Sequence, residues 1–429
     1  MKKILIASYY FPPCNVVSAG RIRSFADNFK QHGLYPIVVT RHWRGDENST
    51  EGYESENLTP PSVTKTDDYT LISLPYPAQL NRFYQRPFLA TRVTKLLLYT
   101  ALYAVGDINP KCNAHAAFYD YLVEYLRENP VDFVLATAFP MNTIRLGSRL
   151  AKKFNIPFIA DFRDLWDNNL LADGYEPSVV ERLQRFIYER HLRDWLREAR
   201  LVTSVSEPLV DEVKRLAPHS KTMVVTNGFE ADLFSDAQKQ NRPPQDQFVF
   251  SVIGTLEERL DLSVMLDGLD LFLVGKDPAE VKLNFIGAAV VPKVKEIIQL
   301  HLGENLANIT ERVCRSEAIS HMTRSHVLFH AGWRGYRGIA SGKIYEYLGA
   351  KRNILIAPND KDVMERIIRT TRAGRVAENH EEFAEVLNGW FNEWKATGDL
   401  AYHGLDDKIG RYTREVQAEK LARAILALQ

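Results

Sequence analysis

The feature that most constrains this sequence is a regular alternation of short apolar runs with longer amphipathic ones. Lys3–Ala7 is an apolar run of strand length, and Pro36–Thr40 is the next one. Between them, before Gly33, apolar residues recur at helical spacing: Ile22, Phe25, Ala26 and Phe29. A strand, a helix and a second strand in this order predict a βαβ unit, the building block of an open parallel sheet.

The alternation continues in two series. The first predicts strands at 133–137, 158–160, 201–205 and 223–225, with helices at 142–154, 179–198 and 208–216. The second predicts strands at 248–253 and near 283–286, 309–313, 327–330, 354–356 and 374–377. The segment between the two series is polar and contains prolines, as linkers do. We therefore predict an α/β protein with an N-terminal domain over 1–237, a linker over 238–247, a second domain over 248–408 and a C-terminal segment over 409–429.

Composition excludes several classes of protein. The chain has 54 basic and 54 acidic residues, so no net charge draws it to nucleic acid, and any anion site has to be local. Three cysteines without a CxxC pair predict neither a zinc site nor a disulfide framework and fit a reducing cytoplasm. The apolar run after Lys3 is too short for a signal peptide. We expect a cytoplasmic protein.

The stretch 41–111 is the least periodic part of the chain. Its polar first part, 45–70, is interpreted as a mobile insertion. In its second part, 81–105, aromatic and leucine side chains alternate with basic ones. Two interpretations are open: a segment lying on a membrane surface, or a helix packed on its own domain.

Six segments together carry a family resemblance: 9–33 (YYFPP…SAGRIRSFADNFKQHG), 157–167 (PFIADFRDLWD), 202–213, 224–234, 251–262 and 341–356 (SGKIYEYLGAKRNILI). In their order and spacing they resemble family 4 retaining glycosyltransferases of the GT-B fold. The resemblance implies two facing Rossmann-like, doubly wound domains, with the last helix, here 418–428, crossing back to the N-terminal domain. It also implies transfer of a sugar from a nucleotide-diphosphate sugar to an acceptor hydroxyl, with retention at the anomeric carbon.

The strongest candidate for donor binding is Glu346, because an ionised carboxylate can accept hydrogen bonds from both hydroxyls of a ribose. The alternative is a carboxylate that only stabilises its own helix. Ser341, Gly342 and Lys343 mark the start of that helix, where free N–H groups would face a diphosphate. Lys343 itself is either a phosphate contact or a surface charge. The first of the family's two glutamates would fall on Gly338 and is absent.

The loop that begins at Gly254 corresponds to the family's diphosphate loop, which carries two basic residues. Here Thr255 takes the first basic position, and Arg259 stands one residue short of the second. Arg259 would stabilise the leaving diphosphate by its charge, or it is simply a solvated surface arginine; Lys343 or Arg334 could compensate for the missing cation. Gly287 ends a strand of the second domain and is expected beneath the nucleoside.

In the N-terminal domain the candidates are Gly20, Asp161, Arg163 and Asp164. Gly20 corresponds to the family's glycine-rich turn, although any such turn can hold a glycine for steric reasons. Asp161 and Asp164 follow a strand at its carboxyl end, where they could orient hydroxyls or accept the acceptor's proton. The alternative is that Asp161 and Arg163 hold the loop through ion pairs. Arg163 stands where family members often have histidine.

The leading functional hypothesis is a glycosyltransferase of cell-surface polysaccharide or glycolipid synthesis. Its predicted partners are a nucleotide-sugar donor and a glycan or lipid-linked acceptor, with peripheral contact to the inner membrane surface and no nucleic acid. No Asp-x-Asp pair stands at a strand end, so we expect no metal and no other cofactor. The alternatives are a non-catalytic binding protein on the same scaffold and a sugar-nucleotide epimerase of the same fold.

Overall fold

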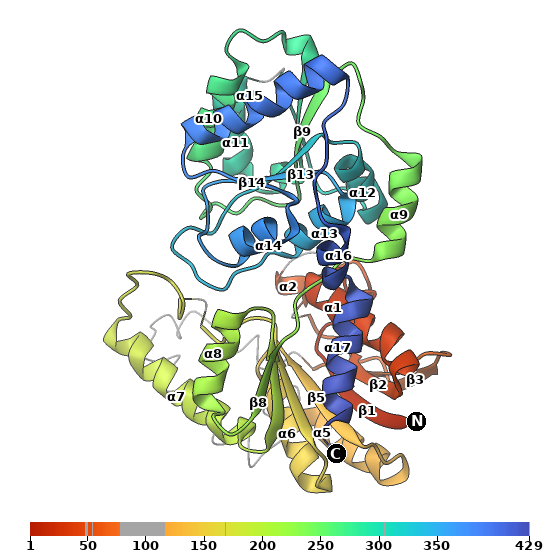
Figure 1. Ribbon diagram of the computed structural model, residues 1–429. Helices are drawn as coiled ribbons and strands as arrows, with labels where there is room; N and C mark the ends of the chain where they lie inside the picture. Colours follow the sequence, from red (N-terminus) through yellow and green to blue (C-terminus); the bar gives the residue numbers. More distant parts are fainter. Residues whose placement is uncertain (48–49, 54, 78–115, 168, 304–305, 429) are drawn as a thin grey trace. The chain divides into compact units, whose positions relative to one another are not determined.

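The computed structural model describes residues 1–429 apart from 48–49, 54, 78–115, 168, 304–305 and 429 (Figure 1). The chain divides into two compact α/β units. Unit 1 contains Met1–Leu170, Gly174–Thr226 and Gln417–Gln429, and unit 2 contains Leu171–Asp173 and Asn227–Val416.

Within the described residues, the sheet of unit 1 has eight strands in the order β3-β4-β2-β1-β5-β6-β7-β8. Neighbouring strands are parallel except for β3 and β4, which are antiparallel. The strands are β1 (Lys2–Ala7), β2 (Leu34–Arg41), β3 (Ser62–Lys65), β4 (Thr70–Leu74), β5 (Phe133–Ala138), β6 (Phe158–Phe162), β7 (Ala199–Ser204) and β8 (Lys221–Val224). The α-helices that accompany them are α1 (Val17–Asn28), α2 (Thr50–Tyr53), α5 (Ala116–Glu128), α6 (Asn142–Phe154), α7 (Val179–Leu196) and α8 (Glu207–Leu216).

The segment 45–70, which we interpreted as a mobile insertion, contains regular structure among its described residues. It contains β3 and leads directly into β4, which extends the sheet beside β2. Thr70, Ile72 and Leu74 are buried while the residues between them are only partly buried, the alternation of a strand with one covered face. Every residue of β3 is exposed, so this edge strand carries no apolar pattern that the sequence could reveal.

The last helix, α17 (Arg414–Leu426), packs on unit 1 (Figure 1). Its buried residues Ala418, Leu421, Ala422 and Ile425 recur at helical spacing and join the same core cluster as Ile4 and Ile6 of β1. The predicted return of the C-terminal helix to the N-terminal domain is therefore confirmed.

The sheet of unit 2, counted over the described residues, has six strands in the order β11-β10-β9-β12-β13-β14, and all its pairs are parallel. The strands are β9 (Phe248–Ile253), β10 (Val281–Ile286), β11 (Ala307–Thr310), β12 (Val327–His330), β13 (Asn353–Ile356) and β14 (Gly374–Val376). The α-helices are α9 (Ala231–Gln240), α10 (Ser263–Leu273), α11 (Pro292–Leu302), α12 (Arg315–Thr323), α13 (Gly342–Ala350), α14 (Val363–Thr371), α15 (His380–Thr397) and α16 (Asp406–Ile409). Both units are thus Rossmann-like, as predicted.

The division between the units lies at Thr226, earlier than the predicted domain end at 237 and linker over 238–247. Phe229 and Phe234 belong to the core of unit 2, and a Cβ added to Gly349 would lie 2.7 and 2.8 Å from their rings. This close packing joins α9 to α13. The polar sequence 238–247 therefore includes the end of a docked helix as well as a connection.

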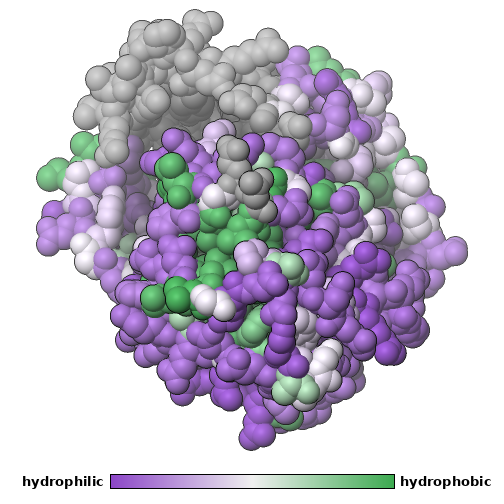
Figure 2. All heavy atoms as spheres, turned by 90° about the horizontal axis from the view of Figure 1, so that it is seen from above, coloured by the Kyte–Doolittle hydropathy of each residue, from purple (hydrophilic) through white to green (hydrophobic). Residues whose placement is uncertain are grey.

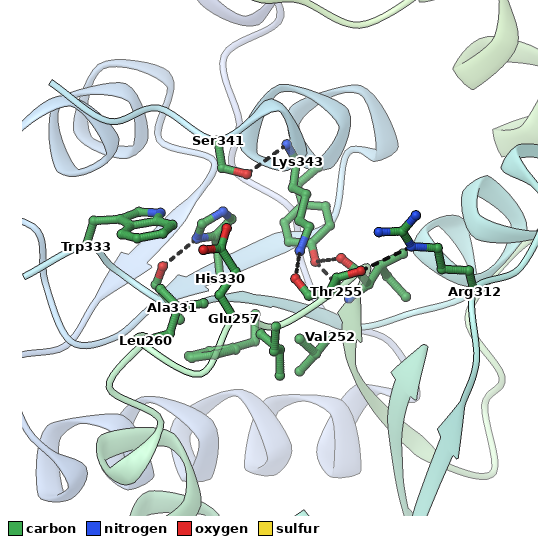
Figure 3. A pocket seen from close by; sticks show the side chains of 14 residues that line it. Val252, Thr255, Glu257, Leu260, Arg312, His330, Ala331, Trp333, Ser341 and Lys343 are labelled. Carbon is green, nitrogen blue, oxygen red and sulfur yellow. Dashed lines mark hydrogen bonds between the residues drawn. The ribbon is translucent and has the colours of Figure 1, made fainter. Parts of the chain in front are cut away.

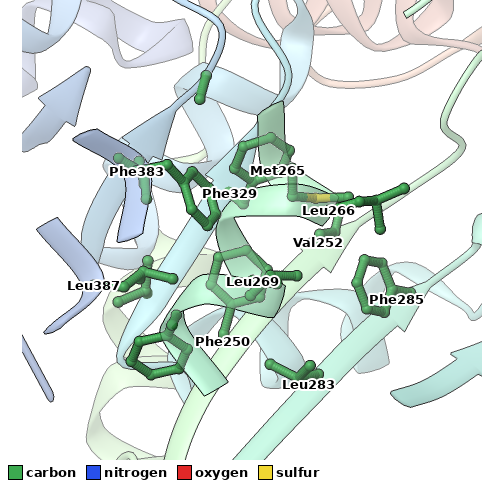
Figure 4. Close-up of a cluster of buried hydrophobic side chains, with 14 of the residues drawn as sticks. Phe250, Val252, Met265, Leu266, Leu269, Leu283, Phe285, Phe329, Phe383 and Leu387 are labelled. Carbon is green, nitrogen blue, oxygen red and sulfur yellow. The ribbon is translucent and has the colours of Figure 1, made fainter. Parts of the chain in front are cut away.

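One hydrophobic core of unit 2 lies between the sheet and the pair α10 and α15 (Figure 4). Phe250 and Phe329 of neighbouring strands contact each other and Phe383 of α15, and Leu269 of α10 belongs to the same cluster. The core fixes the strands on one side, so that the loops at their carboxyl ends rest on a rigid base.

The surface in view in Figure 2 is mainly hydrophilic, with hydrophobic residues gathered in a limited strip near its centre. Among the described residues, no helix is both long enough and apolar enough to cross a bilayer. The segment 81–105, for which we kept two interpretations, lies outside the described residues.

Candidate functional site

The sheet of unit 2 reverses its winding between β9 and β12. From β9 the chain adds β10 and β11 on one side, then returns to add β12, β13 and β14 on the other. Ligands of such sheets bind outside the carboxyl ends of the strands at this switch point. The two strands pair only through Val327–Phe250 and Leu328–Ser251. Both continue beyond the last pair, which leaves room between their ends.

A cavity of about 460 Å³ lies at this point, a size within the usual range of small-molecule sites. Its polar lining residues come from the loops after β9 and β11, the end of β12 and the start of α13: Thr255, Glu257, Arg312, His330, Ser341 and Lys343. Its other lining residues are mainly apolar or aromatic: Val252, Ile253, Leu256, Leu260, Phe329, Ala331, Trp333 and Tyr347.

Lys343 crosses one end of the cavity (Figure 3). Its Nζ donates to the Thr255 carbonyl at 2.6 Å, and its stem lies against Gly254. A Cβ on Gly254 would come within 2.6 Å of Lys343 Cε, and the φ of +95° also favours glycine there. Arg312 donates from Nε to Thr255 Oγ1 at 3.3 Å. Gly254 therefore makes room for the Lys343 amine. From the sequence alone this amine could be interpreted either as a phosphate contact or as a surface charge.

The electrostatics of this end favour an anion. Ser341 is the N-cap of α13, and its hydroxyl accepts from the Lys343 N–H at 3.3 Å. The N-terminus of a helix carries partial positive charge and free N–H groups. Burial lowers the pKa of Lys343 to about 8, because the charges of Glu257 and Glu346 only partly offset the water that the ammonium has lost. A bound anion would restore that charge balance.

Trp333, His330 and Glu257 lie on the side of Lys343 away from Arg312, with Trp333 the farthest from it (Figure 3). His330 is buried, and its Nδ1 lies 2.7 Å from the Ala331 carbonyl. Burial, with the Lys343 charge second, lowers the pKa of His330 to about 4, so the ring is neutral at pH 7. None of these three residues was predicted as a site residue. Their only sequence signal was the place of His330 as the polar last residue of a buried strand.

Glu346 lies on α13 but does not line the cavity. Its side chain is 27% exposed, and Oε1 lies 3.7 Å from Arg315 Nη2. Arg315 and Arg414 also contact Glu230. Burial raises the pKa of Glu346, with Glu230 acting in the same direction and the two arginines opposing. The carboxylate is neither fully solvated nor packed among apolar side chains, and its role toward a ribose stays a prediction.

Arg259 is held by its neighbours. Its Nε donates to Glu257 Oε2 at 2.7 Å, and its guanidinium lies 4.7 Å from the centre of the Trp333 ring. Arg259 itself is not part of the cavity lining, whereas both partners are. Arg334, the other possible substitute cation, donates to the Glu378 carbonyl at 2.6 Å. Lys343 is therefore better placed for an anion than either arginine.

Gly287 follows β10 in a left-handed conformation, with a φ of +91°. A Cβ at this position would lie 3.2 Å from the backbone of Gly254. The two glycines let the loops after β9 and β10 approach each other closely.

In unit 1, Asp161 at the end of β6 is completely buried. Arg21 donates to it twice, from Nε at 3.1 Å and from Nη2 at 2.7 Å. Thr203 and Thr137 donate at 2.6 and 3.1 Å. Burial alone would raise the pKa of Asp161, but Arg21 and the two hydroxyls hold it below the ordinary value. This geometry corresponds to the structural alternative, a buried ion pair, more closely than to a group that meets substrate.

The other candidates of unit 1 are more open. Arg163 and Asp164 form an ion pair with each other, and the Asp164 side chain is 45% exposed. Gly20 lies within the first turn of α1, where its N–H donates to the Val16 carbonyl at 3.4 Å. Asp164 is thus the acidic side chain of this group that solvent, and any ligand, can reach.

Among the described residues, one group of side chains could converge on a metal ion: Asp267, Asp270 and His301. None of them lines the cavity, and exposed carboxylates near a histidine are common without a metal.

Solved structures share this fold over the whole chain. Sucrose-phosphate synthase from Thermosynechococcus elongatus matches with a TM-score of 0.64 at 13% identity, covering 100% of both chains. A glycosyltransferase from Rickettsia africae matches with a TM-score of 0.61 at 14% identity, covering 100% of this chain and 98% of the other. HepE of Anabaena, in complex with UDP and glucose, matches with a TM-score of 0.61 at 14% identity, covering 100% of both.

These likenesses show the GT-B fold. A putative UDP-N-acetylglucosamine 2-epimerase from Listeria monocytogenes also matches, with a TM-score of 0.54 at 11% identity, over 99% of this chain and 96% of the other. No protein-family model matches the chain, and no curated protein matches its sequence.

Proposed function

We propose that this chain is a retaining, metal-independent glycosyltransferase. It would move a sugar from a nucleotide-diphosphate sugar to a hydroxyl of a glycan or lipid-linked acceptor. The observation that carries the proposal is the cavity at the switch point of unit 2, where an amine and a helix N-terminus meet. Such a pairing suits a diphosphate, and glycosyltransferases share the fold.

In this proposal the diphosphate rests on the start of α13, between the Lys343 amine and the Gly342 N–H, where the helix end carries partial positive charge. Glu346 stands three residues after Lys343, on the same side of the helix. A ribose joined to that diphosphate would come within reach of its carboxylate, which accepts the two ribose hydroxyls.

The proposed reaction breaks the bond between the anomeric carbon and the diphosphate oxygen, and forms a bond from that carbon to the acceptor oxygen on the same face of the sugar. The leaving diphosphate oxygen takes the proton of the acceptor hydroxyl, so no separate base is required. Charge develops on the leaving group, and the Lys343 ammonium and the α13 dipole stabilise it electrostatically. These fixed charges would stabilise the leaving diphosphate in place of a metal ion.

We place the reaction in the synthesis of cell-surface polysaccharide or glycolipid, on the cytoplasmic side of a membrane. The support is the sequence pattern of 81–105, in which aromatic and basic residues alternate as in segments that lie on lipid surfaces. Retention at the anomeric carbon is supported by the resemblance of the sequence to family 4 retaining glycosyltransferases.

A thermal-shift screen with UDP, GDP and ADP tests donor binding. A nucleoside diphosphate at about 100 times its Kd should add about 2.7 kcal/mol to stability. Incubation with the matching nucleotide sugars should then release the nucleoside diphosphate slowly, and NMR of a transfer product should show retained anomeric configuration. Failure of all three diphosphates to bind would refute the proposal.

Two alternatives have specific support. Gly338 and Arg163 stand where the family resemblance leads us to expect glutamate and histidine, which favours a non-catalytic binding protein. The shared fold of the Listeria protein favours an epimerase. Binding without release of diphosphate would support the first, and a nucleotide sugar recovered with an inverted ring carbon would support the second.

A further inference from the structure

The two ends of the cavity in unit 2 differ in their chemistry (Figure 3). One end offers the donors Lys343 and Arg312 together with the start of α13. The other end, which we call the hydrogen-bond-acceptor end, consists of Trp333, His330 and Glu257, which lie on the side of Lys343 away from Arg312. A ligand that fills the whole cavity therefore needs an anionic part and a part rich in hydrogen-bond donors.

His330 contributes a hydrogen-bond acceptor. Its Nδ1 lies 2.7 Å from the Ala331 carbonyl, and two acceptors cannot share such a contact without a proton. The proton is thus on Nδ1, and Nε2 of the neutral ring carries a lone pair. Because burial lowers the pKa of His330 to about 4, the ring keeps this state through the physiological range.

Glu257 contributes a second acceptor, which Arg259 orients. The Arg259 guanidinium donates to Oε2 at 2.7 Å and also covers the Trp333 ring, with 4.7 Å between its carbon and the ring centre. One cation thereby holds both the carboxylate and the indole in place. An indole beside two acceptors presents a flat apolar surface next to groups that bind hydroxyls.

We propose that the hydrogen-bond-acceptor end binds the sugar that the nucleotide-sugar donor transfers, and that this sugar is uncharged and has free hydroxyls. The inference rests on the proposed function and adds the class of sugar. The Glu257 carboxylate and His330 Nε2 accept from sugar hydroxyls, while the Trp333 ring packs against the sugar's C–H groups. A uronic acid is disfavoured because its carboxylate would face the like charge of the Glu257 carboxylate, whose side chain is 49% exposed.

Isothermal titration with UDP, UDP-glucose and UDP-glucuronate tests the inference, with the GDP and ADP counterparts used if UDP does not bind. Wild-type protein should bind UDP-glucose more tightly than UDP. It should bind UDP-glucuronate more weakly than UDP-glucose. His330→Phe removes the acceptor and should weaken UDP-glucose binding at least fivefold, while the Kd of UDP changes less than twofold. His330→Gln places an amide oxygen near Nε2 and should restore most of the lost affinity.

Glu257→Gln should narrow the ratio of the UDP-glucuronate and UDP-glucose Kd values at least tenfold. Glu257→Gln also leaves the Arg259 guanidinium without its carboxylate partner. The double variant Glu257→Gln with Arg259→Gln removes that guanidinium as well. If the ratio of the two Kd values stays as low in the double variant as in Glu257→Gln, the effect belongs to the carboxylate. Glu258→Gln is the matched control, because the Glu258 carboxylate is as exposed as that of Glu257 and also lies near a cation, 3.6 Å from Lys293, but does not line the cavity. It should leave all three affinities unchanged.

Equal effects of His330→Phe on UDP and UDP-glucose would overturn the inference and leave the proposed function standing. So would tight binding of UDP-glucuronate by the wild type. If no nucleoside diphosphate binds at all, the proposed function fails first and the inference fails with it. Melting curves of each variant without ligand separate a binding defect from a folding defect.

Discussion

Replacement of Lys343 by methionine should stabilise the unliganded protein and abolish binding of a nucleoside diphosphate. Burial lowers the pKa of this amine from 10.5 to about 8. One pKa unit corresponds to about 1.4 kcal/mol, so an ammonium at this place costs the fold about 3 kcal/mol at pH 7. Methionine has a similar length, and it gives up the hydrogen bond to Thr255, which contributes about 1 kcal/mol. The net gain is about 2 kcal/mol.

The sign of the pH dependence follows from the same values. Below pH 8 the amine is protonated in both the folded and the unfolded chain, and the full cost applies. Between pH 8 and 10.5 the unfolded chain holds more protons than the folded one, so the stability of the wild type rises with pH. The advantage of Lys343→Met should thus be largest below pH 8, and above pH 10.5 the variant should be about 1 kcal/mol less stable than the wild type, because only the lost hydrogen bond to Thr255 remains.

Melting temperatures of both proteins at pH 7 and pH 10.5 measure this difference. For a unit of this size, 2 kcal/mol corresponds to a rise of about 4 to 8 °C at pH 7. The control Lys239→Met replaces an amine that is 72% exposed, and it should shift neither temperature by more than a degree or so. A Lys343→Met protein that melts at or below the wild-type temperature at pH 7 would refute the description of this amine as a costly buried charge.

Four further outcomes follow from the geometry. Binding of UDP, GDP or ADP should weaken as the pH rises from 7 to 9, because the Lys343 ammonium loses its proton near pH 8; titration calorimetry at fixed ionic strength measures this. Gly254→Ala should weaken diphosphate binding more than tenfold, since its Cβ would displace Lys343; Gly275→Ala, with a φ of +72° and open space around it, carries the same backbone strain and should leave binding unchanged. Asp161→Ala should cost about 3 to 5 kcal/mol by leaving the buried Arg21 guanidinium unpaired, and exchange of both residues for apolar ones should recover much of that loss. Glu346→Ala should raise the donor KM sharply with little change in melting temperature, and an unchanged KM would remove this carboxylate from the site.

Much of the fold was predictable because buried parallel strands are continuous apolar runs. β9 and β12 have the predicted bounds, and so does α6. The failures have physical causes as well. The exposed strand β3 has no apolar face, and the docking of α9 depends on contacts of Phe229 and Phe234 with α13 that no local pattern encodes.

Only those parts of the candidate site that are formed by residues adjacent in the chain could be predicted from the sequence. Ser341, Gly342 and Lys343 stand together in the chain, and the start of α13 brings Ser341 and Lys343 to the cavity. Arg259 was predicted as a diphosphate contact on its position alone, whereas its partners Glu257 and Trp333 are 76 positions apart and meet only in the folded unit. Asp161 follows a strand as catalytic groups do, but its four hydrogen bonds to Arg21, Thr137 and Thr203 come from three other elements.

The position of Lys343 gives a physical reason why the missing basic residues after Gly254 need not abolish an anion site. A cation on that loop would reach the cavity from the end of β9, and Thr255 now stands there. Lys343 reaches the same place from α13, passes over the bare backbone of Gly254 and donates to the Thr255 carbonyl. Since the amine is mostly desolvated and its hydrogen-bond partner there is a carbonyl, it gains more from meeting a diphosphate than a solvated arginine would. A buried amine whose charge destabilises the unliganded fold is therefore expected where that charge binds a ligand.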